Sequence, residues 1–597
     1  MSVCRNLTVA CGLLLAGSPA KAGAPTSPDD GKVVAALASA DRVIEDVKYI
    51  VVDLNKDEKS WKDGVYPNLE VWLFGVDQKL PVGVDVIFDG GSDAPWRMQS
   101  YIPMDDEKGR NFRQNNLNPI DISTKPVPGK KNLYKLGGVK DGFLRVTEQK
   151  PVYASMSLLE VEVPANMPHP KEKLDTLLEG GLDVSARWMA TSETADKRDK
   201  GFAKLKQNLL EAIKKRPEES AAAFELRRLT VEQQSDRITK LMTNSAELKV
   251  DWICDPETKR FEGNSRLIGL PNSDVAQTIA KIGSEKSRFA KVKPTDGAVM
   301  TGRILMPLSE KNRDNQTKFY QAWLAAWKEG IDDRKETSAE EKQARKDMAE
   351  RVVKVLTDGL ALGWIDTYGE MVSSDGGLFT AVMGIRVQDS KDVISVLEVL
   401  PKVQAGWKVE LNIGEEQGVA LHKLDLKEQL PSSLKEYFGD SGLMMVGTGD
   451  QVMWVAAGPG AETAIKSAIN SAAAANGEEV PADPLTVTMK MHPVLKFLNA
   501  VMKDEDIEIV RSLNQHQLLQ RREEAKPARE QGRVNRGALK NFNWQDPAIE
   551  ALAAGNDDVE ITIRKNEEAL LGHFKVQEGM MRATGKIVAK FCMEVLQ

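Results

Sequence analysis

The sequence of 597 residues has few of the side chains from which metal sites and disulfide frameworks are built. It contains only four cysteines and five histidines. The histidines stand singly, without the short spacing that zinc ligands show, at His169, His422, His492, His516 and His573. We therefore predict neither a metal site nor a bound cofactor.

An excess of positive charge is missing as well. Lys and Arg number 81 against 88 Asp and Glu, which gives a formal net charge of −7. Attraction of a polyanion would need a basic field, so nucleic acid is excluded as a partner. No stretch approaches the roughly 20 uncharged apolar residues of a transmembrane helix, so no transmembrane segment is predicted.

What is present is the composition of a folded protein, with 41% hydrophobic and 28% charged residues. The length exceeds what one hydrophobic core usually serves, so several domains are expected. Residues 1–22 have the pattern of a signal peptide: Arg5, an apolar run at 7–17, and Ala20-Lys21-Ala22 as the cleavage site. We expect an exported protein, periplasmic or extracellular, that begins at Gly23.

A lipoprotein signal is the alternative, with Cys11 as the acylated residue, but most of the apolar run follows that cysteine instead of preceding it. Cleavage of the leader leaves Cys254 and Cys592. The two could form one long-range disulfide, or each could be a small buried residue. Their number says nothing about the Cα distance that a disulfide requires, so the sequence leaves this open.

The mature chain is predicted to start with a flexible lead-in at 23–40, which is rich in Pro, Gly, Ser and Asp near its beginning. Short alternating strands and amphipathic helices follow, without regular strand–helix alternation. This mixture predicts an α+β fold made of antiparallel sheets with helices on one face.

An internal duplication is the most informative pattern. Residues 182–188 alternate apolar and polar side chains, and residues 485–491 repeat that alternation position by position. Each stretch is followed by helical sequence and then by another alternating strand, at 250–252 and at 559–561. We therefore predict two related lobes, at 41–290 and 297–597.

A hairpin followed by a helix is predicted three times, at 252–282, 364–400 and 560–597. A looser pair of hairpins is expected at 134–144 and 443–454, each turning at a Gly/Asp site. Because one hairpin alone is barely stable in water, we expect the hairpins to pair into shared sheets.

Two packing helices are expected in the first lobe. Phe202, Leu205, Leu209 and Ile213 share one face of a helix that ends before Pro217, and Thr230 with Gln233 resembles a capping box that opens the next helix.

The segment 309–360 is strongly charged and predicts a helical hairpin inserted in the second lobe. On its first helix Phe319, Trp323 and Trp327 follow one another at intervals of four and form an aromatic stripe. The stripe could be a partner-binding platform, for a sugar ring or an apolar surface. It could also pack against a neighbouring helix and sheet, which is what apolar residues at helical spacing usually do.

Motifs of known enzymes are absent, and the catalytic residues, if any, are unknown. Gly458-Pro459-Gly460 lies between a predicted strand and helix but lacks the third glycine of a dinucleotide site, so a plain start of a helix is favoured. His492 could be a base at a strand end, or simply the first residue of a helix. The acidic clusters at 105–107 and 504–506 could bind calcium weakly, but we predict that they are solvated loops and helix starts.

The leader, the diverged hairpin–helix repeats and the acidic, cysteine-poor chain together resemble the large secreted proteins of unknown function found in planctomycete-type bacteria. The resemblance covers most of the mature chain and rests on organisation, without a signature motif. It implies a cell-envelope or periplasmic location and supplies no catalytic residue.

Two functional hypotheses follow. The first is an exported, non-catalytic binding or scaffold protein of the envelope, whose partner would be an envelope protein or a glycan. The second is a secreted hydrolase or glycan-active protein whose carboxylates converge only in the folded chain. A pocket with two carboxylates roughly 5–10 Å apart would favour the enzyme. The oligomeric state cannot be read from the sequence.

Overall fold

The computed structural model describes residues 31–596 except for 72, 89–96, 119–120, 139–141, 158–167, 218, 335–337, 375–376, 404–405, 427–429, 441, 475–482 and 505–541. The predicted signal peptide at 1–22 and the first part of the predicted lead-in lie outside these residues. So do His516 and most of the acidic cluster at 504–506.

Twenty strands run through the described residues. The first ten are β1 (Lys32–Leu37), β2 (Val82–Ile87), β3 (Arg97–Pro103), β4 (Ile122–Pro126), β5 (Leu133–Gly138), β6 (Gly142–Val146), β7 (Tyr153–Ser157), β8 (Val184–Met189), β9 (Ser245–Asp255) and β10 (Arg260–Gly269). The second ten are β11 (Met300–Pro307), β12 (Trp364–Ser373), β13 (Phe379–Arg386), β14 (Lys408–Glu416), β15 (Val419–Asp425), β16 (Leu443–Gly449), β17 (Val452–Ala457), β18 (Leu485–Lys490), β19 (Asp558–Asn566) and β20 (Ala569–Gln577).

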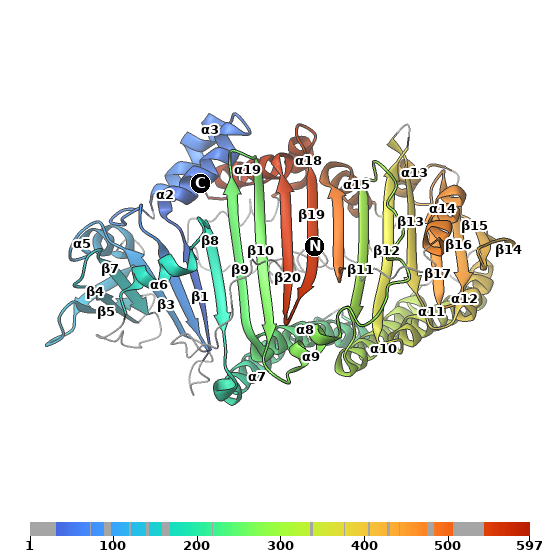
Figure 1. Cartoon of the computed structure of the whole chain (residues 1–597), viewed down its shortest axis with the longest axis horizontal. Helices are drawn as coiled ribbons and strands as arrows, with labels where there is room; N and C mark the ends of the chain where they lie inside the picture. Colours follow the sequence, from blue (N-terminus) through green and yellow to red (C-terminus); the bar gives the residue numbers. More distant parts are fainter. Residues whose placement is uncertain are drawn as a thin grey trace.

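All of these strands form one antiparallel sheet, which extends across the whole molecule in Figure 1. From one edge to the other the order is β4, β5, β6, β7, β3, β2, β1, β8, β9, β10, β20, β19, β18, β11, β12, β13, β17, β16, β15, β14. The α+β class with antiparallel pairing is therefore confirmed.

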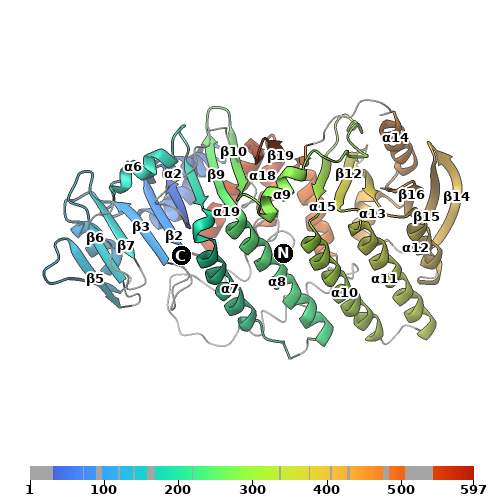
Figure 2. The same cartoon turned by 60° about the horizontal axis from the view of Figure 1, so that its bottom comes forward.

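The helices lie in the connections between strands. They are α2 (Ala40–Lys48), α3 (Glu58–Ser60), α4 (Tyr66–Glu70), α5 (Arg110–Phe112), α6 (Pro170–Leu177), α7 (Ala195–Ala212), α8 (Ala221–Asn244), α9 (Asp274–Lys281), α10 (Glu310–Asp332), α11 (Ala339–Leu360), α12 (Ser390–Val403), α13 (Ser432–Phe438), α14 (Ala461–Ala473), α15 (Met491–Lys503), α18 (Gln545–Leu552) and α19 (Glu578–Glu594). Figure 2 shows α7, α8, α10 and α11 side by side, extending away from one margin of the sheet. We call these four helices the helical array.

Helices cover both faces of the sheet, so the prediction of helices on one face is wrong. On the face that we call outer, α6 packs through Leu174 on Val34, and α14 packs through Ile465 on Trp454. α6 lies over β1, β2 and β8, and α14 lies over β13, β16 and β17, so the two helices are far apart on the sheet (Figure 1). On the opposite, inner face, α9 packs through Ile279 on Leu570. The inner face carries α15, α19 and the strand-proximal ends of α7 and α8 as well.

The side chains of the strands explain why helices cover the two faces differently. Successive side chains along a strand point to opposite faces of the sheet. At the centre of the sheet the outer-facing row is polar, whereas the adjacent inner-facing row is apolar. Asn264 and His573 stand opposite each other in the outer row, and Ile561 and Phe574 in the inner row. In the part of the chain that the structure describes, α6 and α14 cover the outer face on either side of this polar centre, where Val34, Tyr101, Tyr153 and Trp454 supply large apolar side chains.

The predicted lead-in at 23–40 is wrong in its second part, because Lys32–Leu37 is strand β1. It pairs with β2 on one side and β8 on the other. The paired strands bury Val34 and Ala36, which supply the apolar contact that the short sequence Lys-Val-Val-Ala-Ala-Leu cannot gain alone. The sheet therefore already includes residue 32, before residue 41, where the first lobe was expected to begin.

Other predictions are confirmed. The helical hairpin at 309–360 is α10 and α11, and the three hairpin–helix units are β9–β10–α9, β12–β13–α12 and β19–β20–α19. The two looser hairpins are β5–β6 and β16–β17. The sequence left the pairing of Cys254 and Cys592 open, and in the structure both are free and buried. Gly458 is a turn residue with φ of +105° before α14, where a Cβ atom would lie 2.2 Å from the carbonyl oxygen of Phe379.

The two ends of the sheet are strands with one neighbour each among the described residues. β4 pairs only with β5, and it ends in Lys125 and Pro126. β14 pairs only with β15, and its register shifts between Glu410 and Gly414.

Two glycines in strands allow a test of how tightly side chains pack on the second half of the sheet, because only one of them has close neighbours. A Cβ atom on Gly384 would lie 2.5 Å from a ring atom of Phe289, whereas one on Gly302 would approach nothing closer than 3.9 Å. We expect Gly384→Ala to lower the free energy of unfolding by about 1–3 kcal/mol through overpacking. Gly302→Ala should be neutral or raise it by up to about 1 kcal/mol, because alanine loses less backbone entropy. Equal melting temperatures for the two variants in calorimetry would contradict this packing.

Candidate functional site

The aromatic stripe lies on α10, as expected, and is half-buried along its length. The rings of Trp323 and Trp327 stack with centroids 5.2 Å apart, and Phe319 lies beside Tyr320 at 6.1 Å. One turn beyond Trp327 comes Ile331, which is 1% exposed. None of the three stripe residues lines the groove described next. A role of the stripe in partner binding stays a prediction, beside the packing interpretation.

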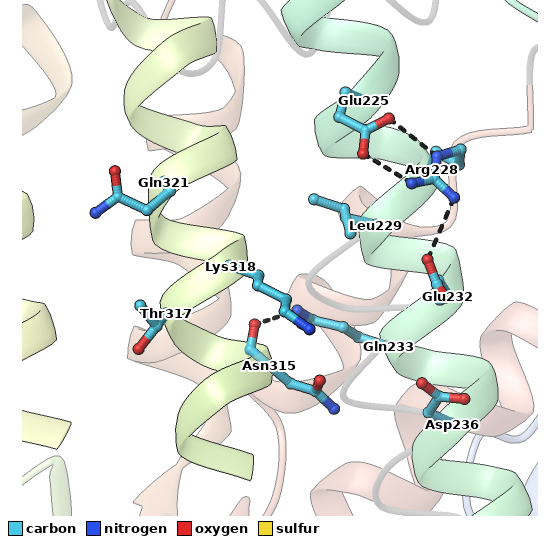
Figure 3. Close-up of a pocket in the computed structure, with 10 residues that line it drawn as sticks. All are labelled: Glu225, Arg228, Leu229, Glu232, Gln233, Asp236, Asn315, Thr317, Lys318 and Gln321. Atoms are coloured by element: carbon cyan, nitrogen blue, oxygen red, sulfur yellow. Dashed lines mark hydrogen bonds and ion pairs between the residues drawn. The ribbon is translucent and has the colours of Figure 1, made fainter. Parts of the chain in front are cut away.

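A groove runs along the seam between α8 and α10, two helices from opposite halves of the sheet (Figure 3). Its first part encloses about 530 Å³ and its second part about 450 Å³. Both parts are lined by Gln233, Asp236 and Asn315, so they form one continuous groove. A volume of this size is within the range of ligand sites in proteins.

The start of α8 explains how the seam is held. Ser220 caps the helix by accepting a hydrogen bond from the Ala223 amide, and its hydroxyl donates to the Glu329 carboxylate over 2.6 Å. Glu329 also accepts from the amide of Ala222. A carboxylate at a helix N-terminus is favourable because the unpaired amides there carry partial positive charge. The last turns of α10 are thus fastened to the first turn of α8, and the two helices run antiparallel.

The predicted capping box at Thr230 and Gln233 is wrong. Ala221–Asn244 is one helix, and the Thr230 hydroxyl donates to the carbonyl of Leu226 four residues earlier. Alanine and leucine favour the helix upstream of Thr230, and Ser220 is the better-placed cap. Gln233 instead reaches across the seam, where its side-chain amide donates to the backbone carbonyl of Asn315.

The first part of the groove is lined by charged side chains that form ion pairs with one another. Arg228 lies 2.8 Å from Glu225 and 3.3 Å from Glu232, and Lys206 of α7 binds Glu232 and Asp236. The contact with Arg228 lowers the pKa of Glu225 below its ordinary value. An acid with a lowered pKa is a poor proton donor at neutral pH, so this wall is suited to binding more than to proton transfer.

The second part of the groove is amphipathic. Four of its lining residues are aliphatic or aromatic, namely Leu308, Tyr320, Leu360 and Ile365, and Ile365 is 40% exposed. Three others are basic, namely Arg237, Lys240 and Lys311. Both groups line the same 450 Å³ space.

Two buried carboxylates converge elsewhere, where α2 meets the sheet. Arg42 lies 2.7 Å from Asp183 and 3.7 Å from Asp46. Asp183 also accepts a hydrogen bond from the backbone amide of Cys254. Burial, and the nearby charge of Asp183, raise the pKa of Asp46 to about 7. Among the described residues neither carboxylate lines either part of the groove, and both are tied to one guanidinium that holds α2 on β8 and β9.

The α8 wall of the groove was missed in the sequence. The feature that could have indicated it is the even distribution of polar residues around α8. This helix carries Glu225, Arg228, Glu232 and Asp236, and it lacks a clearly apolar face. Such a helix usually has charged partners on several sides. The sequence offered no means of knowing that residues 225–236 lie against residues 315–321.

Comparison with family models, with curated proteins and with solved structures gives no match for this chain. Within the described part of the chain, no helix is long and apolar enough to cross a membrane. In the same residues, no group of three or more His, Cys, Asp or Glu side chains is arranged to hold a metal ion.

The pKa of Asp46 predicts how stability depends on pH. Because the folded pKa of about 7 lies above the ordinary 3.8, the folded chain holds this proton more tightly than the unfolded chain, and stability is lost as pH rises from 4 to 7. Asp46→Asn removes that loss. We expect it to raise the free energy of unfolding, and with it the melting temperature, at pH 8, and to change both little at pH 4.

Glu45→Gln, on the exposed side of the same helix, is the matched control and should have a small effect at both pH values. Calorimetry at pH 4 and pH 8 measures the difference. An Asp46→Asn variant that is destabilised at pH 8 would show that the carboxylate is charged and needed by Arg42.

Proposed function

We propose that this protein is an exported, non-catalytic binding or scaffold protein of the cell envelope, which holds its partner in the groove between α8 and α10. The observation that carries the proposal is the groove itself. It is open and of ligand size, and the acids and bases that line its first part neutralise one another. The residues at 1–22 and the organisational resemblance to large secreted planctomycete-type proteins support the location.

We also infer that the two halves of the sheet are copies of one ten-stranded unit. Outward from the β10–β20 pair, one side reads β9, β8, β1, β2, β3, β7, β6, β5, β4. The other side reads β19, β18, β11, β12, β13, β17, β16, β15, β14, which is the same order displaced by ten. Chance would rarely give this correspondence in a sheet of this size.

The helices support the same inference. Each half has helices between its first and second strands, α2 to α4 and α10 to α11, and between its eighth and ninth, α7 to α8 and α15 to α18. Each half also places one helix on the outer face, α6 and α14. The groove lies where the eighth-to-ninth connection of one unit meets the first-to-second connection of the other, so a binding site at the seam depends on both copies.

The alternative, a hydrolase or glycan-active enzyme, would need converging carboxylates with access to substrate. Asp46 and Asp183 converge, but their side chains are only 16% and 4% exposed, and Arg42 occupies the space between them. A buried pair that shares a cation is commonly structural. This favours the binding role.

Affinity capture from an envelope extract tests the proposal. Wild-type protein and an Asn315→Trp variant are used as baits, because the side chain of Asn315 lines both parts of the groove while the bond from Gln233 goes to its backbone. We expect the wild type to retain a partner that the variant loses, with the melting temperature unchanged. Lys200→Glu, on the exposed side of α7, is the control and should retain it.

Equal capture by wild type and Asn315→Trp would remove the groove as the binding site. Turnover of envelope glycans by the purified wild type, abolished in Asp183→Asn, would establish the enzymatic alternative. Deleting 309–360 is a poorer test, because α10 and α11 bury Ile331, Ala349 and Val353 in the body of the protein.

A further inference from the structure

We propose that the groove takes an acidic segment of polypeptide, with one large apolar side chain anchored in its second part. This inference rests on the proposed binding function and names the chemical class of the partner. Three features carry it: uncompensated positive charge, an exposed apolar wall beside that charge, and a polar continuation along the seam.

The positive charge comes from Arg237, Lys240 and Lys311. Lys240 lies 2.8 Å from Asp274, whose pKa is lowered by this contact and by the charge of Lys311. In the part of the chain that the structure describes, Arg237 and Lys311 form no hydrogen bond or ion pair. Asp236, the one acid that lines this part of the groove, is already bound to Lys206 over 2.6 Å. The second part of the groove therefore presents cations that are complementary to a carboxylate.

The apolar wall lies against the same space. Ile365 on β12 is among the most exposed large apolar residues described, and Leu308, Tyr320 and Leu360 line the same part of the groove. Exposed apolar area next to polar groups is typical of an anchor site for one large side chain. A ligand that fills this space must combine an apolar body with negative charge.

The continuation into the first part of the groove decides between a peptide and a small fatty acid. There Gln233 and Asn315 lie in the seam between the two helices, whereas Thr317 and Gln321 lie on the side of α10 that is turned away from α8 (Figure 3). Side-chain amides both donate and accept, as the alternating N–H and C=O groups of an extended backbone require. An aliphatic chain would gain nothing from them, because it has no hydrogen-bonding groups to offer.

Fluorescence polarisation with synthetic peptides tests this inference on the full chain. The probe is fluorescein-labelled GSDELFDGS. The comparison peptides are GSKKLFKGS, with basic residues, and GSDEAADGS, without the apolar anchor. We expect the first peptide to bind at least about tenfold more tightly than either comparison, and the affinity to fall with added salt. Octanoate is added as a competitor and should not displace the peptide.

Two variants and two matched controls locate the site. Arg237→Glu combined with Lys311→Glu should weaken binding about tenfold or more, whereas Lys200→Glu should not. Ile365→Ser should weaken it through loss of the apolar contact, whereas Ile413→Ser, at a residue 45% exposed on β14, should not. All five positions are exposed, so folding should be retained, and thermal melting checks this.

Equal binding of the acidic and basic peptides would overturn the inference, as would displacement by octanoate or equal loss in the control variants. These outcomes are separable from the proposed function. If Asn315→Trp still loses the captured envelope partner while the acidic peptide does not bind, the groove remains a binding site and its partner belongs to another chemical class.

Discussion

The structure depends on the pairing of β10 with β20. Residues Arg260 to Ile268 lie opposite Gln577 to Ala569, so two sets of ten strands share one hydrogen-bonded ladder at their centre. Without this pairing each set would present a long open edge, which invites association with other chains. The same ladder fixes the distance and direction between the halves, and only then can α8 of one half lie along α10 of the other.

The seam is a consequence of that arrangement and is held by few interactions. At one end Glu329 satisfies the amides that open α8, and further along Gln233 reaches the backbone of Asn315. Between these points the facing side chains are polar, and they leave the groove instead of interdigitating. Hydrophobic burial lies outside the groove, for example around Phe202 and Met242, where α7 and α8 meet the sheet, and at Ile331, at the end of α10.

Much of the fold could be predicted from the sequence because alternation of apolar and polar side chains is a local signal. The strands at 182–188, 250–252, 485–491 and 559–561 were found in this way, as were the helices of 309–360. β1 was missed because it is short, follows a Pro- and Gly-rich stretch, and owes its stability to neighbours far along the chain. The start of α8 was misplaced because a Thr–Gln pair in a helix interior has the same spacing as a capping box.

The groove could not be predicted from the sequence, for a different reason. Its walls come from residues about 80 positions apart, joined by contacts such as Gln233 to Asn315, and no local pattern encodes such a meeting. The aromatic stripe attracted notice because large rings are conspicuous in a sequence, whereas the groove is built from ordinary Glu, Arg, Gln and Asn side chains.

The two edge strands of the sheet are unsuited to pairing with a strand of another chain. In β4, Pro126 has no N–H group to donate, and Lys125 would bring its charge into a new interface. In β14, the irregular backbone departs from the straight path that a partner strand would follow. Terminal strands of this kind oppose edge-to-edge growth of the sheet by further copies of the same chain.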